Sequence, residues 1–213
     1  MFFKKTLTFL CIFALLSFPV SGYESEQSEF LRIGNILSNN NIIIGLERIQ
    51  PEDHPLRDEF TAAALRLLEQ KSVDDYPTRT VFSDVPESHW FNPFAVRAKE
   101  LGFIRGNGDG TFRPDEYITQ EEAVTILVSL LGYEEHAKKN GSYPTGYAFM
   151  AKQLGIIDKT TEITNDFSTY NEIFPMLLKT MRLPLCQQSE TLWEKKGYLK
   201  AEGMVQKLES STY

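Results

Sequence analysis

The sequence predicts an all-α protein made of three similar helix–loop–helix units, and two observations support this prediction. The first is an internal repeat: AVRAKELGFI at 95–104 and AFMAKQLGII at 148–157 are identical at six positions. The second is that three segments share one spacing of apolar residues, which is typical of the buried face of an amphipathic helix. Units with matching apolar faces are expected to stack into one shared core.

The apolar residues of these segments fall at offsets 1, 4, 5, 8 and 9 from three glutamates, Glu59, Glu122 and Glu172. This spacing predicts long helices at 57–70, 119–132 and 169–182, packed as a central three-helix bundle with a pseudo-threefold arrangement. Thr180 is the one polar residue of the stripes, which consist of Phe60, Ala63, Ala64, Leu67 and Leu68; Ala123, Ile126, Leu127, Leu130 and Leu131; and Ile173, Met176, Leu177, Thr180 and Met181.

Two of the three predicted long helices begin with a capping box. Thr119-x-x-Glu122 and Thr169-x-x-Glu172 place a hydroxyl and a carboxylate where they can satisfy free amides of the first helical turn. The first long helix has Leu56 at the cap position and therefore lacks the hydroxyl. Pro175 lies near the start of the third helix, where we expect a small irregularity and no break.

The stretch RGNGDGTFRPDEYITQEE at 105–122 joins a glycine-rich loop to the second of these helix starts. A calcium loop is one interpretation of Asn107, Asp109 and Gly110. If Gly110 took the sixth position of such a loop, the first position would fall on Arg105, a cation where calcium needs a carboxylate. We therefore expect a tight turn and no metal site.

The first 22 residues have the pattern of a secretory signal peptide. Lys4 and Lys5 precede an apolar run at 6–20, and Val20 and Gly22 supply small residues for cleavage. The run is short for a membrane span. We expect a secreted chain with no membrane insertion after signal cleavage; an uncleaved anchor is the alternative.

Charge and cysteine content narrow the classes of partner. The net charge of −7 argues against nucleic acid and against an anionic membrane surface. An anionic ligand would therefore have to be held by a few local cations. Signal cleavage would leave Cys186 as a single cysteine, which cannot form an internal disulfide.

No pattern in the sequence points to catalysis. Gly-x-Ser-x-Gly and His-Glu-x-x-His do not occur, and the three histidines, His54, His89 and His136, have no metal-ligand spacing. Cys186 lacks a basic neighbour that would activate its thiol. We expect no enzyme activity, no cofactor and no metal.

One segment resembles a known family nearly from end to end. Residues 82–133 resemble an S-layer homology repeat: they carry a Phe-x-Asp-Val opening, a His-Trp pair, a Gly-Asp-Gly-Thr-Phe-x-Pro loop and a Thr-x-x-Glu helix start. Residues 143–185 resemble a divergent copy, and residues 30–70 resemble a copy with a degenerate opening. The resemblance implies three shorter helices outside the three long ones. The expected organisation is a signal peptide at 1–22, repeats at 28–72, 80–134 and 143–186, and an irregular tail at 187–213.

The resemblance implies a function in the bacterial envelope. Domains of this family attach secreted proteins noncovalently to an anionic, commonly pyruvylated, secondary cell-wall polysaccharide attached to peptidoglycan. The implied location is the cell wall or S-layer of a bacterium. The alternative is an envelope adaptor or structural surface protein that binds surface-layer proteins and no glycan.

The resemblance also implies the binding residues. The family motif Thr-Arg-Ala-Glu places an arginine beside a helix N-terminus, where a carboxylate ligand is favoured. The first copy keeps Arg57, whereas the second and third have Gln120 and Tyr170. The implied polysaccharide-binding residues are Arg57, Glu59, Asp84, Trp90, Gly106, Thr119, Gln120 and Glu122.

Structural roles are the alternatives at four of these positions. Trp90 could be a core anchor, Asp84 a turn cap, Gly106 a backbone requirement and Arg57 a plain surface charge. The tail at 187–213 carries no catalytic signature. We expect it to be the start of a further domain, or the end of a cell-wall anchor that carries no further functional domain.

Overall fold

The computed structural model describes residues 20–69 and 71–186, and this part of the chain is all-α, as predicted. Most of the predicted signal peptide, residues 1–19, and the whole tail at 187–213 lie outside it. No helix in the described ranges combines the length and apolarity needed to cross a membrane. The helices are α1 (Val20–Asn39), α2 (Arg57–Leu68), α3 (Asn92–Glu100), α4 (Gln120–Leu130), α5 (Glu134–Lys139), α6 (Thr145–Leu154) and α7 (Tyr170–Met181), with 3-10 turns at Leu46–Arg48 and Val73–Asp75.

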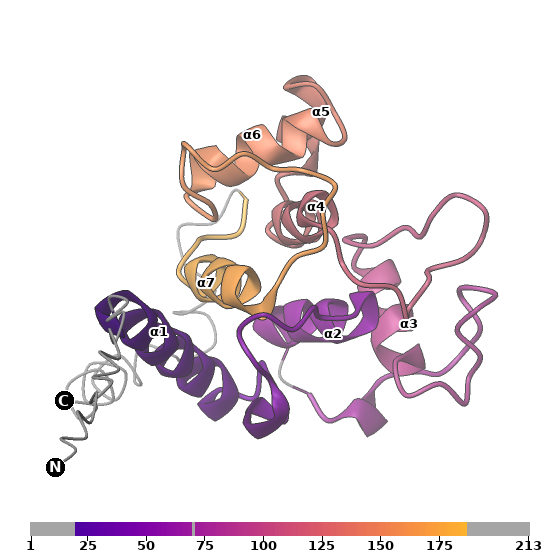
Figure 1. The fold of residues 1–213 in the computed structure, drawn as a ribbon. Helices are drawn as coiled ribbons and strands as arrows, with labels where there is room; N and C mark the ends of the chain where they lie inside the picture. The colour runs from indigo at the N-terminus through magenta and orange to yellow at the C-terminus, as the bar shows by residue number, and fades with distance from the viewer. Residues whose placement is uncertain (1–19, 70, 187–213) are drawn as a thin grey trace, which may run out of the picture.

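The three predicted long helices are confirmed as α2, α4 and α7, and each contacts the other two (Figure 1). Their stripe residues are buried, with Leu68 partly buried at the end of α2. Helix α7 runs through Pro175 without a break. The hydroxyl of Thr180 donates to the carbonyl of Met176 at 2.7 Å, so the one polar stripe residue has a partner in the core.

The remaining helices pack on the bundle in a cyclic order. Helix α3 of the second copy packs on α2 of the first, and α6 of the third copy packs on α4 of the second. Helix α1 of the first copy closes the cycle by packing on α7 of the third. This order is what a pseudo-threefold arrangement requires, although the symmetry itself stays a prediction.

The expectation of three shorter outer helices is wrong for the first copy. Helix α1 has 20 residues, against 9 in α3 and 10 in α6. Its sequence contains no proline, and Phe30, Ile33 and Leu37 form a buried stripe along it. Phe30 stacks on Phe174 of α7 with ring centroids 4.9 Å apart, which ties the long helix to the third copy.

The starts of the long helices are joined by a ring of backbone hydrogen bonds. In each copy, the backbone amide of the first residue of the long helix donates to a backbone carbonyl of another copy. That carbonyl lies three residues before the N-cap residue of the other copy's long helix. The pairs are Arg57 to Glu116 at 2.9 Å, Gln120 to Asp166 at 3.0 Å and Tyr170 to Asp53 at 2.9 Å. Because the same bond recurs from first to second, second to third and third to first copy, it fixes all three helix starts at one end of the bundle.

A second set of bonds is interrupted by a proline, and a histidine replaces the missing donor. Ile118 donates to the carbonyl of Pro55 at 3.0 Å, and Ser168 donates to the carbonyl of Ile118 at 2.9 Å. The third donor would be Pro55, which has no N–H. The ring Nδ1 of His54 lies 2.9 Å from the carbonyl of Ser168 and can donate in its place.

Candidate functional site

A cavity of about 450 Å³ is lined mostly by the second copy, with Arg57 from the first copy and Tyr143 and Tyr147 from the third. Three of the predicted binding residues line it: Arg57 at the start of α2, Gly106 in the glycine-rich loop, and Glu122 in the first turn of α4. They come from segments far apart in sequence, which the backbone ring holds together. The cavity is therefore the candidate site.

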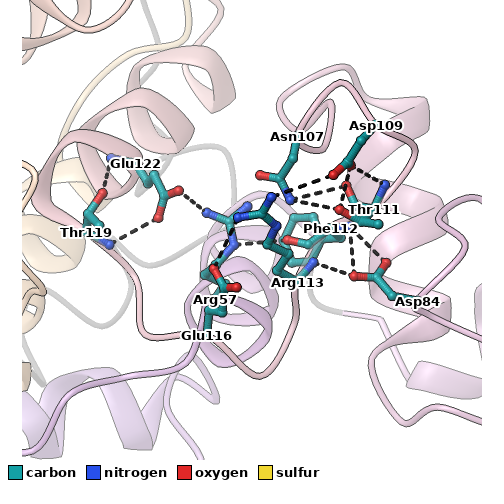
Figure 2. A network of polar contacts seen from close by, with 10 residues as sticks. All are labelled: Arg57, Asp84, Asn107, Asp109, Thr111, Phe112, Arg113, Glu116, Thr119 and Glu122. Atoms are coloured by element: carbon teal, nitrogen blue, oxygen red, sulfur yellow. Dashed lines mark hydrogen bonds and ion pairs between the residues drawn. The ribbon is translucent and has the colours of Figure 1, made fainter.

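Arg57 enters this site as a buried, paired cation. Its residue is 7% exposed, its Nε donates to the carbonyl of Phe112 at 3.0 Å, and its guanidinium lies 4.9 Å from the centre of the Phe112 ring. Its guanidinium also forms an ion pair with Glu122 (Figure 2). The alternative that Arg57 is a plain surface charge is wrong, and an incoming anion meets a guanidinium that already has a carboxylate partner.

The contact between Arg57 and Glu122 has counterparts in the other two copies. Gln120 donates from Nε2 to Glu172 at 2.9 Å, and the hydroxyl of Tyr170 donates to Glu59 at 3.1 Å. Burial and the nearby Glu59 raise the pKa of Tyr170 well above its usual value, so this hydroxyl keeps its proton. The substitutions at the second and third copies thus preserve the link between copies but remove the positive charge.

Each of these glutamates also caps its own helix. The second copy has the full box: Glu122 N donates to the Thr119 hydroxyl at 3.3 Å, and Thr119 N donates to the Glu122 carboxylate at 3.1 Å. The first copy keeps the carboxylate half, with Leu56 N donating to Glu59 at 2.9 Å. Thr119 is buried and lines neither the 450 Å³ cavity nor the larger one described below, so its hydroxyl serves the helix.

The glycine-rich loop is closed by its own side chains, as expected for a tight turn (Figure 2). Asp109 accepts from the amide of Thr111 at 2.9 Å and from its hydroxyl at 2.6 Å, and these bonds hold the pKa of Asp109 below its usual value. Asp84 accepts from the amides of Phe112 at 2.8 Å and Arg113 at 2.7 Å. Asp84 therefore acts as a cap that positions the loop, and it does not line the cavity.

Gly106 has no room for a side chain. Its φ is +78°, and a Cβ atom would lie 2.6 Å from the Thr111 carbonyl and 2.7 Å from the Phe82 ring. The loop can close on Thr111 and pack against Phe82 only because this position is glycine. Gly108, in the same loop, has a similar φ of +84° but open space around it.

We predict that Gly106→Ala destabilises the protein more than Gly108→Ala does. The left-handed backbone costs both variants about 1–2 kcal/mol. The clash adds about 1–3 kcal/mol for Gly106→Ala alone. Urea denaturation of the two variants gives the difference directly, and equal losses of stability would contradict the close approach at Gly106.

Among the cavity residues that the sequence analysis did not predict are an arginine and a tyrosine with polar contacts. Arg105 has a side chain that is 68% exposed and pairs with Glu134, and Tyr143 donates its hydroxyl to Glu121 at 3.2 Å. Both line the cavity. The position of Arg105 directly before Gly106 was the one available signal, whereas nothing near Tyr143 in the sequence links it to the second copy.

Glu59 and Trp90 line a different, larger cavity of about 690 Å³. It lies between the third and first copies, where Tyr170 takes the place that Arg57 has in the smaller cavity. Trp90 is 50% exposed, and the rest of its ring packs against the buried rings of Phe91 and Phe94. Trp90 therefore lies at the edge of the core and leaves half of its side chain open to the cavity. Gln120 lines neither of the two cavities.

A buried carboxyl lies beside the N-terminus of α2. Asp58 is 1% exposed and comes together with His89 and Asp115, their potential ligand atoms lying within 4.8 Å of one another. These residues are far apart in sequence, so spacing could not reveal the group. Asp58 accepts from the amide of Glu59 at 2.7 Å. Its carboxyl therefore already has a partner, and the group carries no argument for a metal.

We predict that Asp58→Asn stabilises the protein at alkaline pH. Burial, reinforced by Glu59 and Asp115, raises the pKa of Asp58 to about 7. Because its pKa is raised on folding, the native state holds an extra proton between about pH 4 and 7, and stability falls as pH rises through this window. The variant should gain about 1–3 kcal/mol over wild type at pH 8 and little at pH 4. Melting curves at both pH values test this, with exposed Asp74→Asn as control; an equal effect at both pH values would contradict it.

Comparison with known proteins identifies the class of domain. Residues 81–124 match the family model described as the S-layer homology domain. The chain is 34% identical over 109 residues to the middle cell wall protein of Brevibacillus brevis, covering 51% of this chain and 10% of that protein. It is 32% identical over 111 residues to the surface layer protein of Brevibacillus choshinensis, covering 52% and 10%. It is 38% identical over 74 residues to outer membrane protein SlpA of Thermus thermophilus, covering 34% and 8%.

The predicted resemblance is thus confirmed for residues 81–124, which match the S-layer homology domain, while the resemblance of the first and third copies stays a prediction. The chain spans about a tenth of the length of these three relatives. The relatives are cell-wall, surface-layer and outer-membrane proteins of bacteria, which agrees with the predicted location at the cell surface.

Proposed function

We propose that this chain anchors noncovalently to the bacterial envelope by binding an anionic, pyruvylated wall polysaccharide in the 450 Å³ cavity. The observation that carries the proposal is the convergence of Arg57, Gly106 and Glu122, from two copies, on one cavity. Its volume lies in the range of sites for small molecules, which suits a terminal part of a polysaccharide. The role requires binding and no chemistry.

The charges of the cavity allow a carboxylate of the ligand to replace a glutamate as the partner of an arginine. Two guanidinium groups, Arg57 and Arg105, face two carboxylates, Glu122 and Glu134. Arg57 is buried, and its pair also links two copies. The Arg105 side chain is 68% exposed, and Glu134 also pairs with Lys138 at 2.9 Å, so this carboxylate keeps a cation when Arg105 moves. Arg105 can therefore leave Glu134 and join Arg57 in binding the ketal carboxylate of the ligand by charge-assisted contacts.

The test is co-sedimentation with purified cell-wall sacculi, before and after extraction of their secondary polymer. We expect the protein to sediment with untreated sacculi and to remain in solution when the polymer has been extracted from them. In calorimetric titration with polymer fragments, removal of ketal pyruvate should weaken binding at least tenfold. Arg105→Ala should do the same, whereas Arg79→Ala, an exposed cation paired with Glu100 away from the cavity, should not.

Two results would contradict the proposal. Retention that survives extraction of the polymer would favour the adaptor function, in which a wall protein is the partner. Binding that is unchanged by removal of pyruvate would exclude the carboxylate as the recognised group.

A further inference from the structure

Three aromatic side chains meet where the helix starts are joined. His54, Tyr117 and Phe167 each lie two residues before the cap of a long helix, one in each copy. The isolated bridges Leu56–Tyr117 and Thr119–Phe167 bring their segments together. The ring centroids are 5.4 Å apart for His54 and Tyr117, 5.6 Å for Tyr117 and Phe167, and 6.2 Å for His54 and Phe167. We call these three residues the aromatic triad.

The aromatic triad is exposed. Tyr117 is 47% exposed and Phe167 is 53% exposed, and His54 is also at the surface. The rings are tilted with respect to one another, so their faces are not used up by mutual stacking. Exposed aromatic faces that gather at one place are typical of binding surfaces.

From this geometry we propose that the aromatic triad is a stacking platform for an uncharged sugar ring of the same wall polysaccharide. The inference rests on the proposed function and adds a second contact region to it. The face of a pyranose carries C–H groups, which pack against the negative face of an aromatic ring. Its edges carry hydroxyls, which need polar partners.

Such partners lie beside the triad. His54 and Tyr117 also line the 690 Å³ cavity, together with Asp53 and Arg48. The triad and this cavity therefore form one continuous surface, with rings for the sugar face and charged groups for its hydroxyls. A polymer held on the platform can extend into the cavity.

The size of the triad favours a sugar over a protein. Two half-exposed rings offer on the order of 200 Å² of surface. A stable protein interface needs about 800 Å² from each partner. The area of the triad corresponds to one or two sugar rings.

The experiment is calorimetric titration of the whole chain with wall-polysaccharide fragments, native and after removal of ketal pyruvate. Tyr117→Ala/Phe167→Ala should weaken binding of both fragments at least tenfold, because stacking does not depend on the carboxylate. Tyr117→Phe keeps the ring and should bind within about twofold of wild type. Phe149→Ala is the matched control, since Phe149 is 42% exposed on α6 and lines neither cavity.

A second measurement uses the wild-type protein and so does not require the variants to fold. In the wild-type protein, ring proton resonances of Tyr117 and Phe167 should shift on addition of fragments, and those of Phe149 should not. If wild type binds while the double variant binds equally well, or the Tyr117 and Phe167 resonances do not move, the platform is wrong and the proposed function stands. If wild type binds no fragment, both are wrong.

Discussion

Replacing Leu127 by aspartate is expected to prevent cooperative folding. Leu127 is fully buried in α4, the helix that contacts α2, α6 and α7. A carboxylate at this position would lose its hydration, and none of the stripe residues around it is a cation that could pair with it. The cost is several kcal/mol, comparable with the whole stability of a small domain, about 5–15 kcal/mol.

Circular dichroism melts of Leu127→Asp and Leu101→Asp make the comparison. Leu101 is 37% exposed at the end of α3, so its aspartate can stay hydrated and should shift the melting temperature only slightly. A soluble Leu127→Asp variant that melts cooperatively near the wild-type temperature would count strongly against the three-helix core.

The fold could be predicted to this level because its signal is local. A stripe such as Ile126, Leu127 and Leu130 identifies both the helix and its buried face, and Thr119 with Glu122 identifies the start. The predicted helix at 119–132 corresponds to α4 at Gln120–Leu130. The length of α1 was not predicted: its buried stripe of Phe30, Ile33 and Leu37 lies in the second half of the helix, and the sequence does not show that this stripe packs against α7.

The site was only partly predictable for the same reason. The motif identified Arg57 and Gly106, and the structure brings both to one cavity. It predicted that Glu122 caps α4 but did not reveal that Glu122, 65 positions further on, also pairs with Arg57. For Trp90, the motif gave the position in the second copy but not the neighbours. The cavity that Trp90 lines lies between the third and first copies. Contacts between copies are set by tertiary packing, which residue spacing does not encode.

The three equivalent contacts suggest how binding and stability are divided among the copies. Arg57, Gln120 and Tyr170 all donate to a glutamate of the next copy, but only Arg57 brings a charge. A neutral donor is therefore sufficient to join two copies. The charge of Arg57 exceeds what this structural role requires, which is why we assign it to recognition of an anion.

Arg57→Ala is accordingly expected to lower both stability and affinity. It leaves Glu122, whose side chain is 28% exposed, without its cation and opens a space beside Phe112. The loss of stability should be about 1–3 kcal/mol, less than for a fully buried pair. Affinity for pyruvylated polymer fragments should fall by about 1.5–3 kcal/mol, as for a lost charge-assisted hydrogen bond.

Arg57→Gln separates the two roles, because the chain itself shows that glutamine can serve at this position. Gln120 donates to Glu172 from the equivalent place, so the Arg57→Gln variant should keep most of the wild-type stability while its affinity stays low. Gln120→Arg tests the converse: it adds a guanidinium at the equivalent contact between the second and third copies and should strengthen binding. Urea denaturation and calorimetric titration of the same preparations give both quantities. Wild-type affinity in Arg57→Gln would show that Arg57 serves only to hold the first two copies together.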